Sequence, residues 1–213
     1  MASRQDLPVI VGVDGSSASL AAADFAVDEA TLRKSALRIL YGHMRHPSPS
    51  LWRSRKEPYV TRGIGRLLEA VADRARTRGP AIDVGVDLMY EDPRTALVER
   101  SGHAQLVVVG HSGRGGAALG SVAGYVASHA RSPVIVHRPI TGVRHESPPR
   151  PVMVGVDGSV QSAAAVEFAL DEAALRGADL TAVFVWTHPR GAEPAGLHPV
   201  AYDYGWNFRD TRS

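Results

Sequence analysis

Apolar residues in the first 140 positions fall into two kinds of run, which repeat in alternation along the chain. Runs that are continuous or alternate with polar residues predict strands at 9–13, 37–41, 82–89, 106–109 and 134–136. Runs with helical spacing predict helices at 17–34, 62–78, 93–102 and 121–129. Strands that alternate with helices indicate an α/β fold with a five-stranded, parallel, doubly wound, Rossmann-like sheet and right-handed crossovers. Such a sheet binds its ligand beyond the carboxyl ends of its strands.

The segment 44–60 interrupts this alternation. It carries Pro47, Pro49 and Pro58 among mixed charges and has no apolar period, so we expect a loop there.

The opening pattern returns later in the chain. PVIVGVDGSSASLAAADFAVDEATLR, at 8–33, reappears as PVMVGVDGSVQSAAAVEFALDEAALR at 151–176, a constant offset of 143 (151 minus 8). A repeat that keeps a strand, a turn and a helix face together indicates a duplicated unit. We therefore expect a first domain at 1–140, a linker rich in proline and charge at 141–150, and a truncated second copy at 151–213 with strands at 152–156 and 180–186.

Composition excludes several classes of protein. The chain has 24 basic and 22 acidic side chains, a net charge of +2, which gives no broad electrostatic reason to bind nucleic acid or an anionic membrane. It has no cysteine, which rules out disulfides, thiolate metal sites and redox thiols. No apolar stretch approaches the roughly 20 residues that cross a bilayer, and no signal sequence is evident. We expect a soluble, cytoplasmic protein.

Two glycine-containing turns follow strands that this sheet would place near its crevice. The first is Gly12-Val-Asp14-Gly15-Ser16, in which the Asp14 carboxylate could accept hydrogen bonds from a ribose or an exocyclic amine. An equally good interpretation is that Asp14 and Ser16 only cap the following helix, with Ser16 or Ser17 as the N-cap residue. The repeat copies both features and does not separate the two.

The second turn is LVVVGHSGRGGAALGSV, at 106–122, a strand followed by a glycine-rich loop and a helix start. Backbone amides in such a loop, together with the positive end of the helix dipole, form a site for a phosphate anion. Arg114 could add a charge-assisted bond and Ser121 a hydroxyl donor. A glycine loop without any ligand is the alternative, because loops of this kind are common.

Taken in order, three motifs resemble those of the universal stress protein family, A-type domain. They are VGVDGS at 11–16, DP-x(3)-LVE at 92–99, and VVVGHSGRGG…LGSVAGYVASHARSPVIVHRP at 107–139. The resemblance covers 7–140 and then 151–187, and it implies the α/β sandwich of the adenine nucleotide α-hydrolase superfamily. Family members that bind ATP carry glycine, two residues, glycine, nine residues, glycine and serine or threonine. Here Gly110, Gly113 and Gly120-Ser121 match, but only six residues (114–119) lie between the last two glycines, a difference of three.

The resemblance implies ATP, with or without Mg²⁺, as the ligand. Asp14 would meet the adenosine part, Tyr41 would line the adenine pocket, and the loop residues would surround the ribose and phosphates. The full set of expected binding residues is Val13, Asp14, Gly15, Tyr41, Gly110, Gly113, Arg114, Gly120, Ser121 and Val122. The second copy repeats the aspartate turn at Asp157 but has no glycine loop, so we expect no complete nucleotide site there.

We interpret the protein as a nucleotide-binding regulator of the stress response that acts through nucleotide-dependent interactions, and not as an enzyme. It lacks a glycine-lysine-serine/threonine phosphate loop, a histidine-x-glycine-histidine motif and a pyrophosphatase loop, so phosphoryl transfer lacks its electrostatic part. Slow ATP hydrolysis, or an interaction scaffold that binds no nucleotide, are the alternatives.

Histidine pairs and a basic segment have simpler explanations than a metal site or an RNA contact. Pairs such as His43 with His46, or His111 with His129, form no metal motif, and we expect no metal site. The basic segment 52–56 is better explained as a solvated loop than as an RNA contact.

The second copy is too short to enclose its own apolar strands, and an aromatic tail follows at 188–213. We expect the copy to dock on the first domain or on another subunit. By resemblance, a homodimer would pair through the last strand of the first domain, 134–136, and a further protein partner could use the tail.

Overall fold

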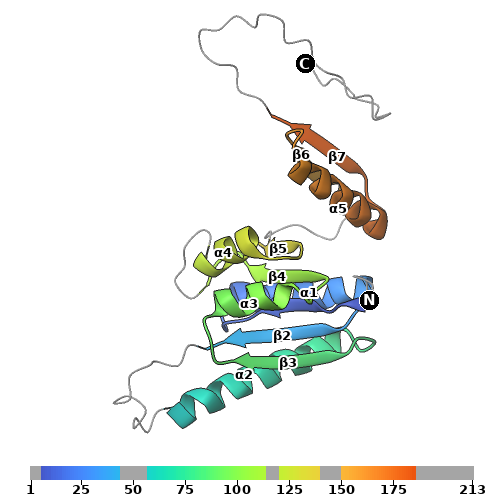
Figure 1. The fold of residues 1–213 in the computed structure, drawn as a ribbon. Helices are drawn as coiled ribbons and strands as arrows, with labels where there is room; N and C mark the ends of the chain where they lie inside the picture. Colours follow the sequence, from blue (N-terminus) through green and yellow to red (C-terminus); the bar gives the residue numbers. More distant parts are fainter. Residues whose placement is uncertain (1–5, 44–56, 114–119, 140–149, 186–213) are drawn as a thin grey trace, which may run out of the picture. The chain divides into compact units, whose positions relative to one another are not determined.

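The computed structural model describes residues 6–43, 57–113, 120–139 and 150–185 (Figure 1). The chain divides into two compact units, Met1–Pro149 and Arg150–Ser213, and each is considered by itself. Among the described residues, no helix has both the length and the apolar character needed to span a bilayer.

The first unit is built on a parallel sheet of five strands in the order β3-β2-β1-β4-β5. The strands are β1 (Val9–Gly12), β2 (Leu37–Gly42), β3 (Val84–Met89), β4 (Leu106–Gly110) and β5 (Val134–His137). The central strand β1 pairs with β2 on one side, Val9 opposite Leu37, and with β4 on the other, Val9 opposite Leu106. The predicted five-stranded, parallel α/β fold is confirmed.

Four helices cover the two faces of this sheet: α1 (Ser17–Leu32), α2 (Glu57–Arg78), α3 (Pro93–Ser101) and α4 (Ser121–His129). Helix α1 packs against α2, and α3 packs against α4. Alternate residues of each strand point to opposite faces, so Ile10 and Val107 lie with Leu97 and Val126 under α3 and α4, while Val9 points toward α1. Two helix layers around one sheet bury most residues of the central strands β1, β2 and β4, as their apolar runs predicted, whereas the edge strands β3 and β5 are only partly buried.

In the first unit, the element ends differ from the predictions by two residues or more at three places. Helix α2 begins at Glu57, so the prediction of a loop was wrong for 57–60. Pro58 is the second residue of that helix, where a missing N–H removes no helical hydrogen bond. Helix α1 ends at Leu32, two residues before Lys34, whose φ of 53° is left-handed and ends the helix. Strand β3 begins at Val84, because Ile82 donates its N–H to Gly79 O in a turn. The rest of the predicted loop, 44–56, lies outside the described residues.

The second unit contains β6 (Val152–Val156), α5 (Val160–Arg176) and β7 (Leu180–Phe184). The two strands pair in parallel, Val152 opposite Leu180. Strand β7 ends at Phe184, earlier than the predicted 186. Helix α5 ends at Gly177, whose φ of 60° is the left-handed conformation that glycine adopts without strain. Most of the expected linker, 141–149, and the aromatic tail lie outside the described residues.

Candidate functional site

The candidate site lies where β1 and β4 end side by side at one edge of the sheet. After β1 the chain enters α1 on one face, and after β4 it leads to α4 on the other. The chain therefore diverges at this point, beyond the carboxyl ends of the two strands. In open parallel sheets this divergence is the usual position of a ligand.

The turn after β1 is held by its own polar side chains. Asp14 Oδ1 accepts a hydrogen bond from Ser16 N–H at 2.9 Å. Ser16 is the N-cap residue of α1, and its hydroxyl accepts from Ser19 N–H at 3.2 Å. Gly15 has a φ of 83°, which an L side chain rarely adopts. Ser16 thus performs the capping, and Asp14 fixes the turn in front of it.

Two glycines bring the loop after β4 against this turn. A Cβ atom on Gly110 would lie 2.8 Å from the carbonyl carbon of Ala18, so only glycine fits beside the first turn of α1. A Cβ atom on Gly113 would lie 3.2 Å from Asp14 Oδ2, which places the backbone of Gly113 against the carboxylate. Residues that are 99 positions apart in the sequence (113 minus 14) therefore meet beyond the ends of β1 and β4.

The two ends of the glycine-rich loop also meet each other. Gly120 N–H donates to His111 O at 2.8 Å, and a Cβ atom on Gly120 would lie 3.4 Å from Gly113 N. The amide of Gly120 is therefore engaged within the protein. The residues between, 114–119, lie outside the described part of the chain, and Arg114 is one of them.

Helix α4 starts where the two ends of the glycine-rich loop meet. Its N-cap residue is Gly120, with a φ of −64° and a ψ of 144°, and no side chain caps the helix. Ser121 is exposed and Val122 is half-buried in the first turn. The first amides of a helix have no partner within it and carry partial positive charge, which favours an anion next to Ser121 and Val122.

Val13 and Tyr41 are almost completely buried, which leaves little of either residue's surface for contact with a ligand. Val13 N–H donates to Leu40 O at 2.9 Å, which extends the pairing of β1 and β2 by one residue and places Tyr41 level with Val13. Val13 is 5% exposed and Tyr41 is 8% exposed. Tyr41 is thus at the expected edge of the sheet, mostly covered by the first unit itself.

Two histidines meet at the same edge, a contact that the sequence analysis missed. His111 N–H donates to His137 O at 2.9 Å, and the His137 ring stacks on Phe25 of α1 with 4.7 Å between ring centroids. Burial lowers the pKa of His137, the nearby His111 lowers it further, and Asp24 opposes both. Each histidine stands at the end of a strand that the sequence predicts, but only the pairing of β4 with β5 brings the two together.

Of the histidines considered as metal ligands, His129 makes its contacts within its own helix. His129 Nδ1–H donates to Tyr125 O at 2.9 Å, and its ring stacks on that tyrosine. Over the described ranges, no three histidine or acidic side chains gather in a way that could hold a metal ion. His46 and the basic segment 52–56 lie outside the described residues.

The second unit repeats the turn after β1 but not the rest of the site. Asp157 Oδ1 accepts from Ser159 N–H at 2.9 Å, and the Ser159 hydroxyl accepts from Ser162 N–H at 3.1 Å. The hydrogen bond from Ser159 lowers the pKa of Asp157. The same bonds therefore form without a glycine loop beside them, and the contact between Gly113 and Asp14 is what distinguishes the first unit.

The sequence and the fold of this chain are similar to those of known proteins. The model of the universal stress protein family matches residues 7–138 and 149–205. A universal stress protein of Mycobacterium tuberculosis is 34% identical over 206 residues, which are 91% of this chain and 69% of that protein.

Two solved structures are also similar. A protein from the universal stress protein family of Burkholderia pseudomallei is 25% identical and covers 64% of this chain and 98% of its own, with a TM-score of 0.50. A universal stress protein in complex with cAMP is 31% identical and covers 62% of this chain and 96% of its own, with a TM-score of 0.48.

Proposed function

The chain belongs to the universal stress protein family, and from this membership and the contact between Gly113 and Asp14 we propose that its first unit binds an adenine nucleotide where β1 and β4 end. The protein would then act as a regulator whose interactions depend on the bound nucleotide.

The contact between Gly113 and Asp14 carries this proposal. It joins a carboxylate, which suits the hydroxyl and amine donors of a nucleoside, to the start of a glycine-rich loop and an uncapped helix, which suit phosphates. The packing against Ala18 already explains the glycine at Gly110. Packing does not demand one at Gly120, where a Cβ atom would make only ordinary contacts. Close approach of a ligand to the backbone is a reason for a glycine there.

Each residue has a separate role in this proposal. Asp14 would accept hydrogen bonds from the ribose, and Gly15 and Val13 would form the backbone beside it. The small exposed part of Tyr41 would line the adenine side. The amides of Gly113, Ser121 and Val122 would face the phosphates, with Arg114 as a cationic partner. ATP, with or without Mg²⁺, is the ligand that the family motif favours, although the loop is three residues shorter than that motif.

We propose binding without efficient catalysis. Phosphoryl transfer needs cations or acids placed at the reacting phosphate, and the Walker-type lysine is missing from the glycine loop. The first unit would also associate with a second copy of the chain through the edge strand β5, which pairs with β4 alone among the described strands.

The test is a titration with ATP, read as thermal stability and by calorimetry. A ligand at 100 times its dissociation constant stabilises the folded state by about 2.7 kcal/mol. We expect Gly113→Val to abolish the response, since the side chain would fill the space against Asp14. Asp14→Asn keeps the acceptor for Ser16 and removes only the charge, so we expect about tenfold weaker binding.

The repeat supplies the matched control, because Asp157→Asn makes the same change in a turn without a glycine loop. It should leave ATP affinity unchanged. No response to ATP in the unchanged protein would support the alternative of an interaction scaffold. Repeated turnovers of ATP would instead support a slow hydrolase.

A further inference from the structure

We propose that one face of α5, formed by Glu167, Leu170 and Asp171, is a docking surface for a basic amphipathic helix. The partner helix would carry two arginines four residues apart and an apolar side chain that packs on Leu170. The three residues that define this acidic face lie on one side of the helix, since they are three and four positions apart.

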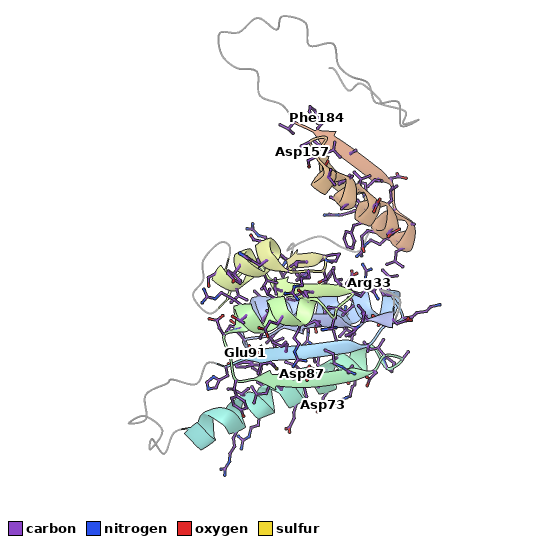
Figure 2. The ribbon with its side chains drawn as sticks, viewed as in Figure 1. Arg33, Asp73, Asp87, Glu91, Asp157 and Phe184 are labelled. Atoms are coloured by element: carbon purple, nitrogen blue, oxygen red, sulfur yellow. The ribbon has the colours of Figure 1, made fainter. Side chains whose placement is uncertain are left out.

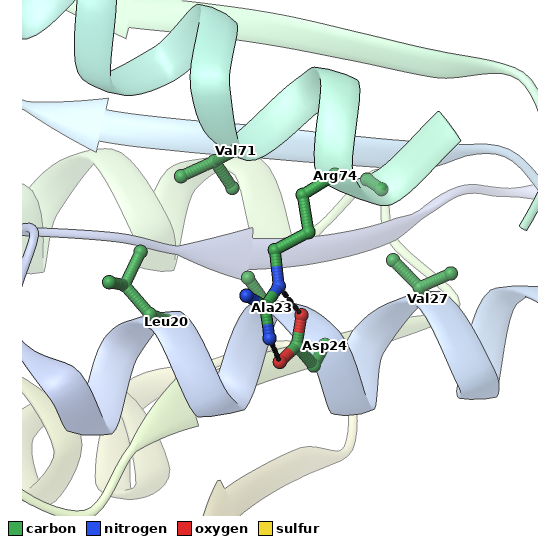
Figure 3. Close-up of a pocket in the computed structure, with 7 residues that line it drawn as sticks. Leu20, Ala23, Asp24, Val27, Val71 and Arg74 are labelled. Atoms are coloured by element: carbon green, nitrogen blue, oxygen red, sulfur yellow. Dashed lines mark hydrogen bonds and ion pairs between the residues drawn. The ribbon is translucent and has the colours of Figure 1, made fainter. Parts of the chain in front are cut away.

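In the first unit, the corresponding face of α1 is covered by another helix, α2. Helix α2 lies along α1 there, and Val71 of α2 faces Leu20 and Val27 of α1 (Figure 3). Arg74 of α2 pairs with Asp24 of α1, with its Nε donating to Oδ1 at 2.6 Å.

A second arginine repeats this pairing one turn further along. Arg78 donates to both carboxylate oxygens of Asp28, at 2.7 and 2.6 Å. Between the two ion pairs, Val27 is 1% exposed. Two carboxylates four residues apart therefore match two arginines four residues apart, with an apolar contact between them.

The repeat transfers the α1 half of this interface to α5. With the offset of 143, Asp24 corresponds to Glu167, Val27 to Leu170 and Asp28 to Asp171. Each position keeps its chemistry: a carboxylate, a branched apolar side chain and a second carboxylate. A helix face that contacts only solvent does not require an apolar side chain between two carboxylates.

The α2 half has no counterpart in the described part of the second unit. Leu170 is 41% exposed, and Glu167 and Asp171 are both exposed. Among the described residues, neither carboxylate takes part in an ion pair or side-chain hydrogen bond. Buried Glu172 shows the contrast, since it pairs with Arg176 of the same helix at 2.8 Å. The acidic face therefore has the charge and the apolar centre of an interface, and a basic helix is what complements them.

The probe for this surface is a labelled peptide with the sequence of residues 62–78, which contains both arginines, added to the full chain. We expect saturable binding by fluorescence anisotropy that weakens as salt rises, because the pairs are exposed to solvent. A peptide with Arg74→Glu and Arg78→Glu should bind at least tenfold more weakly.

A charge exchange separates the acidic face from other surfaces. The double variant Glu167→Arg and Asp171→Arg should lose the original peptide and regain the charge-reversed one. If the double variant still binds the original peptide with full affinity, the peptide occupies another surface, such as α1, and the proposal fails. It fails also if no peptide binds, or if sedimentation shows a self-association that Leu170→Arg abolishes, since the occupant would then be a second copy of this chain.

Discussion

The segments β1–α1–β2 and β6–α5–β7 have nearly the same sequence and the same local structure, but very different burial. In each segment the first strand is followed by an aspartate that accepts a hydrogen bond from a serine N–H two residues later, at 2.9 Å in each unit. Both helices are capped by that serine, and both carry a buried glutamate paired with an arginine four residues on. Repeated sequence thus specifies repeated local structure.

Burial follows the neighbours instead. Ile10 is 5% exposed under α3 and α4, whereas its counterpart Met153 is 70% exposed. Figure 2 labels Asp157 and Phe184 in the second unit, and Phe184 is 55% exposed. A β–α–β segment can form its own turns and caps, but it cannot supply the second helix layer that excludes water from its sheet.

The largest contrast should come from removing the apolar side chain at this shared position. We expect Ile10→Ala to destabilise the first unit by about 2–5 kcal/mol, because it opens a cavity in a packed core. Met153→Ala should cost no more than about 0.5 kcal/mol, since the side chain is exposed. Native-state hydrogen exchange of β1 and β6 measures each unit separately. Equal losses would mean that Met153 is covered in solution.

The buried ion pair should show a smaller contrast. Glu29 is 1% exposed and Arg33 is 10% exposed, against 7% and 30% for Glu172 and Arg176. Glu29→Gln leaves a buried guanidinium without its charge partner and should cost about 2 kcal/mol. Glu172→Gln should cost clearly less, because water reaches Arg176. Exchange rates in α1 and α5 provide the measurement, and a larger effect in α5 would contradict the role assigned to burial.

Removing the N-cap hydroxyl should destabilise the two units equally. Ser16→Ala and Ser159→Ala each remove one hydroxyl that accepts a backbone N–H, and each should cost about 1 kcal/mol. The measurement is exchange in the first turns of the two helices. A cap that mattered in one unit only would show that the turn depends on its tertiary surroundings.

The smallest effect concerns pH and helix α3, which covers Ile10. Asp92 caps α3, and its hydrogen bonds with Arg94 lower the pKa of Asp92 to about 2. Because this pKa lies below the usual value of about 3.9, the cap stabilises the fold above pH 4 and loses that contribution as pH falls toward 2. The contribution should stay below about 1 kcal/mol at this exposed pair. Acid titrations of the unchanged protein and Asp92→Asn should differ in that window, and coincident curves would contradict the assignment.

Much of the first unit was predictable because strands covered on both faces are continuous apolar runs and amphipathic helices keep their period. The prediction of a loop was wrong for 57–60 because a proline such as Pro58 breaks a helix in its interior but is compatible with its first turn. The pairing of His111 with His137 was missed because it depends on which strands are neighbours. Among the candidate binding residues, the sequence pointed to Asp14 and the glycines of the second turn, and the structure brings Gly113 against Asp14. Arg114 lies outside the described residues.

The sequence by itself determined the repeat, the turns, the caps and the order of strands and helices, since these depend on residues a few positions apart. Only the tertiary structure decided that Gly113 lies against Asp14, that Gly120 is bonded to His111, and that Val27 is covered while Leu170 is exposed. Those contacts join residues from separate elements, and the sheet order that brings the elements together is a property of the packed fold. The same β–α–β sequence therefore carries a helix face covered by α2 in one unit and an uncovered acidic face in the other.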